Sequence, residues 1–169
     1  FKFAKGAPEV QAILSEVKRL ESEGCEFEAA EASFEMLIRK QLGQFNPSFT
    51  LLEYHSTHRF HGGEHGFETC EATVKIEIGG ERVYTVAEGD GPVNALDNAL
   101  RKALITSYPA IQTMRLVDYK VRIIDSGSGT AAKTRVLITS TDGNATWSTV
   151  GCSFNIIDAS WKALVDGIE

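Results

Sequence analysis

The chain has 169 residues, a formal net charge of −6 and an apolar fraction of 43%. This length suits one ordinary domain, or a domain with a short helical lead-in, and the apolar fraction supports a packed core and excludes a disordered chain. The acidic balance argues against a nucleic-acid groove and against binding to an anionic membrane.

No apolar run approaches the roughly 20 residues that cross a bilayer, and no signal peptide opens the chain. The three cysteines are Cys25, Cys70 and Cys152, far apart and odd in number. They argue against a disulfide scaffold and against a zinc site made of thiolates. A reducing cytoplasm is therefore the expected location. The start at Phe1, without Met, suggests a piece of a longer protein.

The first part of the chain predicts two helices, over residues 8–23 and 28–42. Apolar residues recur at helical spacing in both, and glycines at positions 24 and 43 end them. Two helices without a sheet bury little surface. We expect them either to pack on a neighbouring domain as a linker subdomain, or to form an N-terminal hairpin on the same core.

From Phe49 the apolar period changes to two, which predicts strands over 49–60, 67–78 and 81–88. Gly79-Gly80 has the composition of a two-residue hairpin turn. That turn would pair Ile76 with Val83. On the other face it would pair Glu77 with Arg82, so that opposite charges meet.

An amphipathic helix follows from Pro92 to about Leu104, directly after the glycine turn Gly89-Asp90-Gly91. Val93-Asn94-Ala95-Leu96-Asp97 is echoed by Phe154-Asn155-Ile156-Ile157-Asp158, and Arg101-Lys102-Ala103 by Trp161-Lys162-Ala163. The helix and its glycine turn are therefore repeated near the C-terminus.

The second half repeats the order of the first. A strand over 114–124 places Val117, Tyr119, Val121 and Ile123 on one face, and further strands run through 135–139 and 145–150. Asp142-Gly143, taken as a two-residue turn, would pair Ile138 with Trp147 and Val136 with Thr149. A turn at Gly151-Cys152-Ser153 then opens the closing helix, which ends near Ile168.

The predicted fold class is α+β. Two strand-strand-strand-helix units, over about 47–110 and 111–169, form a domain with pseudo-twofold symmetry, and a two-helix linker subdomain over 1–46 precedes them. The offset of about sixty residues is too long for a solenoid array.

All four histidines, His55, His58, His61 and His65, lie in one short stretch that also holds Glu64. Such spacing invites a metal site, but on a strand His55 and His58 point to opposite faces. A solvated strand end is the favoured interpretation, and no metal ligand is assigned. No cysteine or serine has a recognisable base, so no catalytic residue is assigned either.

Both glycine turns place backbone N–H groups at a helix start, where a carboxylate can be held. The lysine and spacing of a phosphate-binding loop are missing, so a small anion such as an amino-acid carboxylate fits better than a nucleotide. Simple connecting turns are the alternative.

Three segments, GERVYTVAEGDGPVNALDNALRKAL, RLVDYKVRIIDSGSGTAAKTRVLI and WSTVGCSFNIIDASWKALVDGIE, resemble the C-terminal regulatory domain of the 2-isopropylmalate synthase and citramalate synthase superfamily. The lead-in LESEGCEFEAAEASFEMLIRK is similar to the linker of the citramalate branch, although Cys25 stands where that linker has an aromatic residue and Ala29 where it has a glycine.

The resemblance implies an allosteric, dimerising domain that binds an end-product amino acid between its two units. The effector would be isoleucine in the citramalate branch and leucine in the isopropylmalate branch. A TIM-barrel domain with a divalent metal, outside this sequence, would condense acetyl-CoA with pyruvate. No cofactor is expected in the chain itself.

By the same resemblance, nine residues would bind the effector: Asp90, Gly91, Val93, Leu116, Tyr119, Ile123, Ala132, Thr134 and Cys152. Helix-start N–H groups would hold the carboxylate, and Val93, Leu116, Tyr119 and Ile123 the branched side chain. A plain core role is the alternative for Leu116, Tyr119 and Ile123. Two other functions stay open: a purely structural dimerisation module, and a metalloenzyme that uses the histidines.

Overall fold

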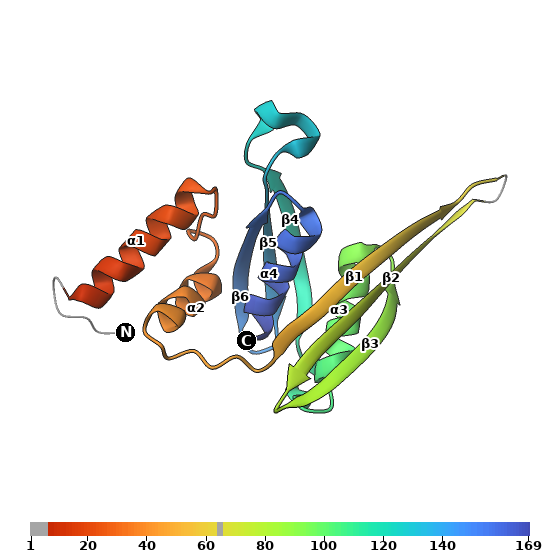
Figure 1. Ribbon diagram of the computed structural model, residues 1–169, viewed down its shortest axis with the longest axis horizontal. Coiled ribbons are helices and arrows are strands. Elements are labelled where there is room, and N and C mark those ends of the chain that lie inside the picture. Colours follow the sequence, from red (N-terminus) through yellow and green to blue (C-terminus); the bar gives the residue numbers. More distant parts are fainter. Residues whose placement is uncertain (1–6, 64–65) are drawn as a thin grey trace. The chain divides into compact units, whose positions relative to one another are not determined.

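The computed structural model describes residues 7–63 and 66–169, and the chain divides into two compact units (Figure 1). Unit 2 runs from Pro47 to Met114, whereas unit 1 combines the helical lead-in up to Asn46 with Arg115–Glu169. Within these described residues, none of the helices has the length and apolar character needed to span a bilayer. Each unit contains a three-stranded antiparallel sheet followed by a helix, as the α+β prediction requires.

Unit 2 consists of β1 (Thr50–His61), β2 (Phe67–Ile78), β3 (Glu81–Gly89), α3 (Pro92–Leu104) and the short η1 (Pro109–Gln112). The sheet order is β1-β2-β3, and Ile76 pairs with Val83 while Glu77 pairs with Arg82. The register predicted from the glycine turn is therefore confirmed. Because β3 ends opposite Cys70, β1 and β2 continue beyond it as the long two-stranded arm visible in Figure 1.

The core of unit 2 lies between α3 and β2. Alternate residues of β2 meet one helix face at zero or almost zero exposure; they are Ala72, Val74 and Ile76 on the strand and Ala95, Leu96, Ala99, Leu100, Ala103 and Leu104 on the helix. Small residues at every fourth helix position let the backbone approach the sheet. Close approach is most marked at Gly89, where an added Cβ would lie 2.4 Å from the backbone nitrogen of Ala95.

Unit 1 contains α1 (Pro8–Ser22), α2 (Glu31–Gln41), β4 (Arg115–Ile123), η2 (Ser126–Ala131), β5 (Thr134–Thr141), β6 (Thr146–Ser153) and α4 (Ile156–Ile168). The sheet order is β4-β5-β6, and α4 packs on β5 and β6. The helix α2 contacts both β6 and α4 (Figure 1). The lead-in helices thus share a compact unit with the second sheet.

The register predicted for the second hairpin is wrong by two residues. Ile138 pairs with Thr149 and not with Trp147, and Val136 pairs with Gly151. The reason is the side chain of Asp142, whose Oδ1 accepts the N–H groups of Asn144 and Ala145, at 2.8 Å each. This Asx-type turn takes up four residues where the sequence suggested two.

The predicted alternation along β4 is also corrected, because the strand contains a register shift between Leu116 and Asp118. Leu116 pairs with Ser140 and Tyr119 pairs with Ile138, so Leu116 and Tyr119 share the α4 face despite their odd spacing. Val117 is the extra residue. A shift at the matching place in β1, between Leu51 and Glu53, is the counterpart in unit 2.

Each unit contains an equivalent hydrogen bond from its third strand to the helix that follows. The Thr85 hydroxyl donates to the Ala99 carbonyl at 2.7 Å, and the Thr149 hydroxyl donates to the Ala163 carbonyl at 2.7 Å. Ala99 therefore corresponds to Ala163. The repeat in the sequence had aligned Ala103 with Ala163, which is wrong by about one helical turn. The apolar pattern does not reveal this error, because a shift of one turn leaves the same apolar face.

Candidate functional site

The first glycine turn, in unit 2, has the geometry of a helix start. Gly91 is the N-cap of α3 with an extended backbone (φ −161°), and Pro92 is the first helical residue. The exposed Asp90 donates its backbone N–H to Asn94 Oδ1 at 3.0 Å. Val93 is half-buried in the first turn of the helix. The N-cap residue Gly91 makes no side-chain capping bond, so Asp90, Gly91 and Val93 surround a helix N-terminus that its own N-cap residue leaves uncapped.

The second glycine turn was placed too early by the sequence. Gly151, Cys152 and Ser153 belong to β6, and the chain turns at Phe154 and Asn155. Asn155 caps α4, because its Oδ1 accepts the Ile157 N–H at 2.9 Å. The N-cap residue of α4 therefore supplies a side-chain acceptor, unlike that of α3.

The start of α4 carries a carboxylate that is paired within the unit. Burial alone would raise the pKa of Asp158, but hydrogen bonds from Lys162 and Ser153 lower the pKa below its usual value. Lys162 Nζ lies 2.7 Å from Asp158 Oδ2 and also donates to the Cys152 carbonyl at 3.2 Å. These bonds tie the first turn of α4 to the end of β6.

Four predicted contacts lie on one face of the unit 1 sheet, the face on which α4 packs. Leu116, Tyr119 and Ile123 belong to β4, and Thr134, the Cα partner of Ile123, opens β5. Since α4 packs on β5 and β6, the edge strand β4 stays open: Tyr119 is 37% exposed, Val121 43% and Ile123 60%. We name Leu116, Tyr119, Val121 and Ile123 the β4 strip.

Tyr119, within the β4 strip, also makes a polar contact with α4. The Tyr119 hydroxyl lies 2.9 Å from the Ser160 hydroxyl, which in turn donates to the Ile156 carbonyl at 2.7 Å. The apolar ring of Tyr119 is thereby fixed over the open part of the sheet. Ala132, which is buried, lies between η2 and β5 beside Thr134. An apolar strip with one oriented hydroxyl can receive a small aliphatic group.

The structure does not bring Cys152 together with the β4 strip. Cys152 pairs with Arg135, whereas Thr134 pairs with Ile123, so Cys152 points to the opposite face of the sheet. There its sulfur forms a disulfide with Cys25 of the lead-in. The sequence argument against a disulfide framework therefore missed this one bond. Their separation of 127 residues offered no local signal for this pairing.

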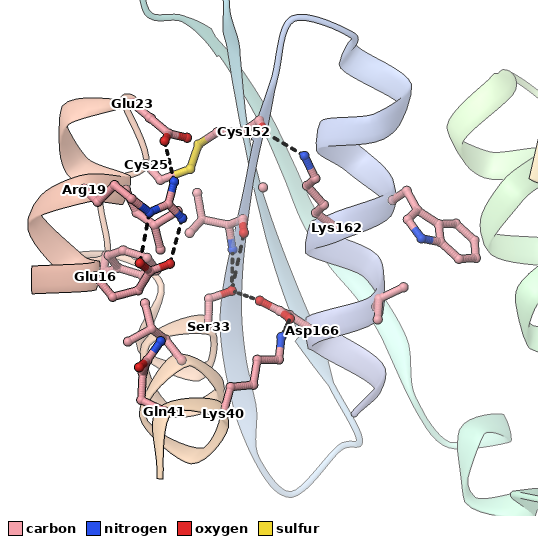
Figure 2. Close-up of a pocket in the computed structure, with 17 residues that line it drawn as sticks. Glu16, Arg19, Glu23, Cys25, Ser33, Lys40, Gln41, Cys152, Lys162 and Asp166 are labelled. Atoms are coloured by element: carbon pink, nitrogen blue, oxygen red, sulfur yellow. Dashed lines mark hydrogen bonds and ion pairs between the residues drawn. A yellow bond between two sulfur atoms is a disulfide. The ribbon is translucent and has the colours of Figure 1, made fainter. Parts of the chain in front are cut away.

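The lead-in meets the sheet around Ser33, a polar residue in the apolar stripe of α2. Its hydroxyl donates to Asp166 Oδ2 at 2.8 Å and accepts the Val150 N–H at 3.0 Å, and Lys40 Nζ bonds Asp166 Oδ1 at 3.0 Å (Figure 2). Sequence reasoning missed these residues. The only available signal was a serine at the spacing of Met36 and Leu37.

A cavity of about 520 Å³ lies at this junction. Its lining includes both cysteines of the disulfide, and Figure 2 shows Arg19 between Glu16 and Glu23 near the sulfur atoms. Arg19 Nη2 lies 2.7 Å from Glu16 Oε1. The charged groups labelled around the cavity have partners within the protein.

The histidines that the structure describes, His55, His58 and His61, all lie in β1. His55 Nδ1 lies 2.6 Å from the Thr73 hydroxyl, His58 Nε2 lies 3.4 Å from a Glu68 oxygen, and the His61 ring stacks on Phe67 at a centroid distance of 4.3 Å. The candidate ligands Glu64 and His65 lie outside the described residues. Across 7–63 and 66–169, no three His, Cys, Asp or Glu side chains converge in a way that could hold a metal ion.

Comparisons with known proteins agree with the resemblance in the sequence. The family model of the LeuA allosteric (dimerisation) domain matches residues 28–169. The (R)-citramalate synthase of Synechocystis sp. is 48% identical over 164 residues, which cover 96% of this chain and 30% of that protein. The (R)-citramalate synthase of Geobacter sulfurreducens is 46% identical over 93% of the chain and 30% of its own length.

Similarity to the other branch is weaker and covers less of the chain. The 2-isopropylmalate synthase of Shewanella piezotolerans is 35% identical over 102 residues, or 57% of this chain and 17% of that protein. The chain spans about 30% of the length of the citramalate synthases it matches. Its match to the family model over residues 28–169, well over half of the sequence, shows that this chain belongs to the LeuA allosteric (dimerisation) domain family.

Proposed function

We propose that the chain is the C-terminal regulatory and dimerising domain of a citramalate synthase, and that isoleucine is the effector that inhibits the enzyme. The identity of 46–48% to two (R)-citramalate synthases, over more than nine-tenths of the chain, carries this proposal. The catalytic part, a barrel with a divalent metal that condenses acetyl-CoA with pyruvate, would belong to the rest of a cytoplasmic, homodimeric enzyme.

The predicted contacts form two sets, one in each unit. In unit 2 the uncapped start of α3, with Asp90, Gly91 and Val93, suits a carboxylate. In unit 1 the β4 strip suits a branched aliphatic side chain, with Ala132 and Thr134 next to it. Cys152 drops out of this set, because its side chain faces the lead-in.

The matching bonds of the two units support an internal duplication with pseudo-twofold symmetry. Thr85 and Thr149 make the same bond to the following helix, and the strand irregularities after Leu51 and Leu116 occupy matching places. Inhibition would follow if the effector binds one arrangement of the enzyme better than another, since only differential affinity shifts an equilibrium.

Inhibition of the complete enzyme by isoleucine tests the proposal. Val93→Ala and Tyr119→Ala should each raise the half-inhibitory concentration about tenfold or more, since each removes an apolar contact. Tyr84→Ala is the matched control, because Tyr84 is a 64% exposed tyrosine outside both sets, and it should leave inhibition unchanged. Unchanged inhibition in both variants would favour the purely structural dimerisation module. Stronger inhibition by leucine than by isoleucine would assign the chain to the isopropylmalate branch.

A further inference from the structure

The loop that joins α1 to α2 is held on β6 by a covalent bond in addition to ordinary packing. Cys25 and Cys152 are each 8% exposed, and their Cα atoms are 5.8 Å apart. The two sulfurs lie in an apolar cluster that also contains Ala30 and Val150, with Leu20, Phe27 and Leu137 packed against it. The bond therefore closes across the junction between the lead-in and the sheet.

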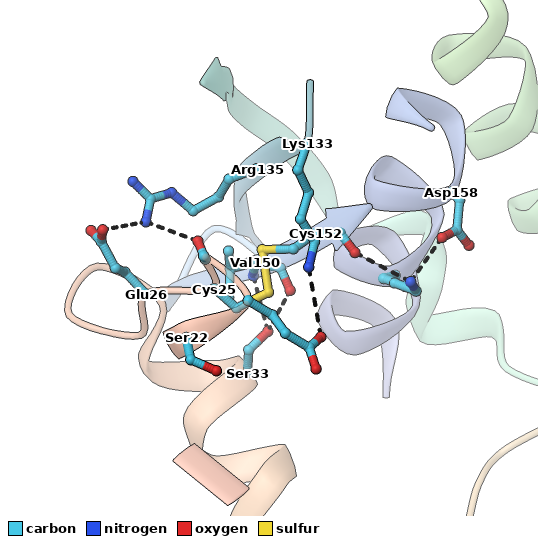
Figure 3. The surroundings of a disulfide bond; sticks show 12 residues. Ser22, Cys25, Glu26, Ser33, Lys133, Arg135, Val150, Cys152 and Asp158 are labelled. Atoms are coloured by element: carbon cyan, nitrogen blue, oxygen red, sulfur yellow. Dashed lines mark hydrogen bonds and ion pairs between the residues drawn. A yellow bond between two sulfur atoms is a disulfide. The ribbon is translucent and has the colours of Figure 1, made fainter. Parts of the chain in front are cut away.

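Polar contacts hold the same loop in place independently of the sulfurs (Figure 3). Arg135 Nη1 lies 2.7 Å from Glu26 Oε1 and donates to the Gly24 carbonyl at 3.2 Å. Lys133 Nζ lies 3.7 Å from Glu23 Oε2. Since these contacts do not need the disulfide, the two thiols of the reduced chain stay close enough to react again.

The cavity beside the disulfide gives a small molecule access to it. Both cysteines line this space of about 520 Å³, together with Arg19 and Lys162. Arg19 and Lys162 are paired with Glu16 and Asp158, so the reactivity of the pair depends on access to the sulfurs and not on local charge. A cavity of this volume lies in the range that takes a small-molecule ligand.

We propose that Cys25 and Cys152 form a reversible thiol–disulfide pair, oxidised and reduced by exchange with a low-molecular-weight thiol of the glutathione class. In oxidation, the thiolate of one cysteine attacks a sulfur of the small disulfide and releases one small thiolate. The second cysteine, as its thiolate, then attacks the protein sulfur of the mixed disulfide and releases the second small thiolate. Two protein thiols are thus oxidised and one small disulfide is reduced to two thiols, with both protein protons passing to solvent or to the released thiolates.

The pair controls how freely α1 and α2 move against β6. A cross-link between segments 127 residues apart opposes their separation more strongly than the surrounding packing alone. In a reducing compartment, where stable structural disulfides are rare, such a bond is expected to be transient and to respond to redox conditions. Its effect on feedback inhibition rests on the proposed function, but the exchange chemistry does not.

Counting thiols tests the exchange directly. After treatment with oxidised glutathione, denaturation and alkylation should label one cysteine per chain, Cys70, whereas reduced glutathione should restore all three. Cys70→Ser should retain the loss and recovery of two thiols, whereas Cys25→Ser should form no internal disulfide and lose at most one thiol, as a mixed disulfide of Cys152. Failure of oxidised glutathione to remove two thiols, or of reduced glutathione to restore them, would overturn the proposal.

Hydrogen exchange tests the mechanical consequence without any effector. Reduction should speed amide exchange in α2 about tenfold or more, because opening the junction no longer has to stretch a cross-link. Cys25→Ser should exchange at the fast rate in both buffers. Equal rates in oxidised and reduced wild type would show that the bond does not restrain the helices. Since neither readout uses isoleucine, failure of the regulatory function would leave both results intact.

Discussion

Replacing Gly151 with alanine should separate α4 from its sheet. Gly151 is buried in β6 opposite Val136, and a Cβ added there would lie 1.9 Å from the Ala159 carbonyl oxygen and 3.0 Å from the Ala163 nitrogen. Both clashes are with helix backbone, which cannot rotate away as a flexible side chain can. The helix must therefore retreat by more than about 1 Å to reach an ordinary van der Waals distance.

The loss in the free energy of unfolding has two contributions. Overpacking of a well-packed core typically costs about 1–3 kcal/mol, and a rigid backbone clash belongs at the upper end. The retreat also weakens the bond from Thr149 to the Ala163 carbonyl, worth about 1 kcal/mol. We expect a total loss of about 3–4 kcal/mol, which for a chain of this size lowers Tm by roughly 6–16 °C.

Both tryptophans, Trp147 and Trp161, lie in unit 1, so urea unfolding followed by tryptophan fluorescence reports on this unit. Gly127→Ala is the control in the same unit, because its added Cβ would meet one atom within 4 Å, Asp125 Oδ1, at the ordinary contact distance of 3.4 Å. It should change the free energy of unfolding by no more than about 0.5 kcal/mol. A Gly151→Ala protein that unfolds at the wild-type urea concentration would refute the close packing of α4 on β6.

Two further predictions concern the junction between the lead-in and the sheet. Ser33→Ala removes the hydroxyl that bonds Val150 and Asp166, and should lower the free energy of unfolding by about 1–3 kcal/mol in the same urea assay; a loss near zero would show that the junction does not depend on it. Arg135 holds the pKa of Glu26 below its usual value by a hydrogen bond. This ion pair therefore stabilises the loop above the pKa of the unfolded chain and loses that effect as pH falls through the lower folded value. The protection factors of the α2 amides, which divide out the pH-dependent intrinsic exchange rate, should therefore fall between about pH 5 and pH 3 in wild type and respond less in Glu26→Gln. An equal response in both proteins would exclude Glu26 as the titrating group.

The strand pairing predicted from the sequence succeeded where a turn is made by backbone alone. Gly79-Gly80 admits one short turn, and the register of β2 with β3 followed from it. The second hairpin failed because the Asp142 side chain bonds two following N–H groups and lengthens the turn. Composition alone did not distinguish these two uses of a turn residue.

The candidate site was predictable only in part, for reasons of periodicity and distance. A strand of period two would separate Leu116 from Tyr119, and only the register shift in β4 places them on one face. The pairing of Cys25 with Cys152 depends on the docking of the lead-in, a long-range contact that leaves no pattern in either segment. The uncapped start of α3, by contrast, follows from local residues, and the sequence located it correctly.

Isothermal titration calorimetry of the chain with isoleucine, leucine and valine tests the central claim most directly. The account predicts saturable binding of isoleucine, tighter than that of leucine or valine and weakened by Tyr119→Ala. Tighter binding of leucine would move the chain to the isopropylmalate branch and leave the sensor role intact. The absence of any binding heat, together with an unchanged Tm in the presence of all three amino acids, would contradict the proposal that this domain senses a branched-chain amino acid.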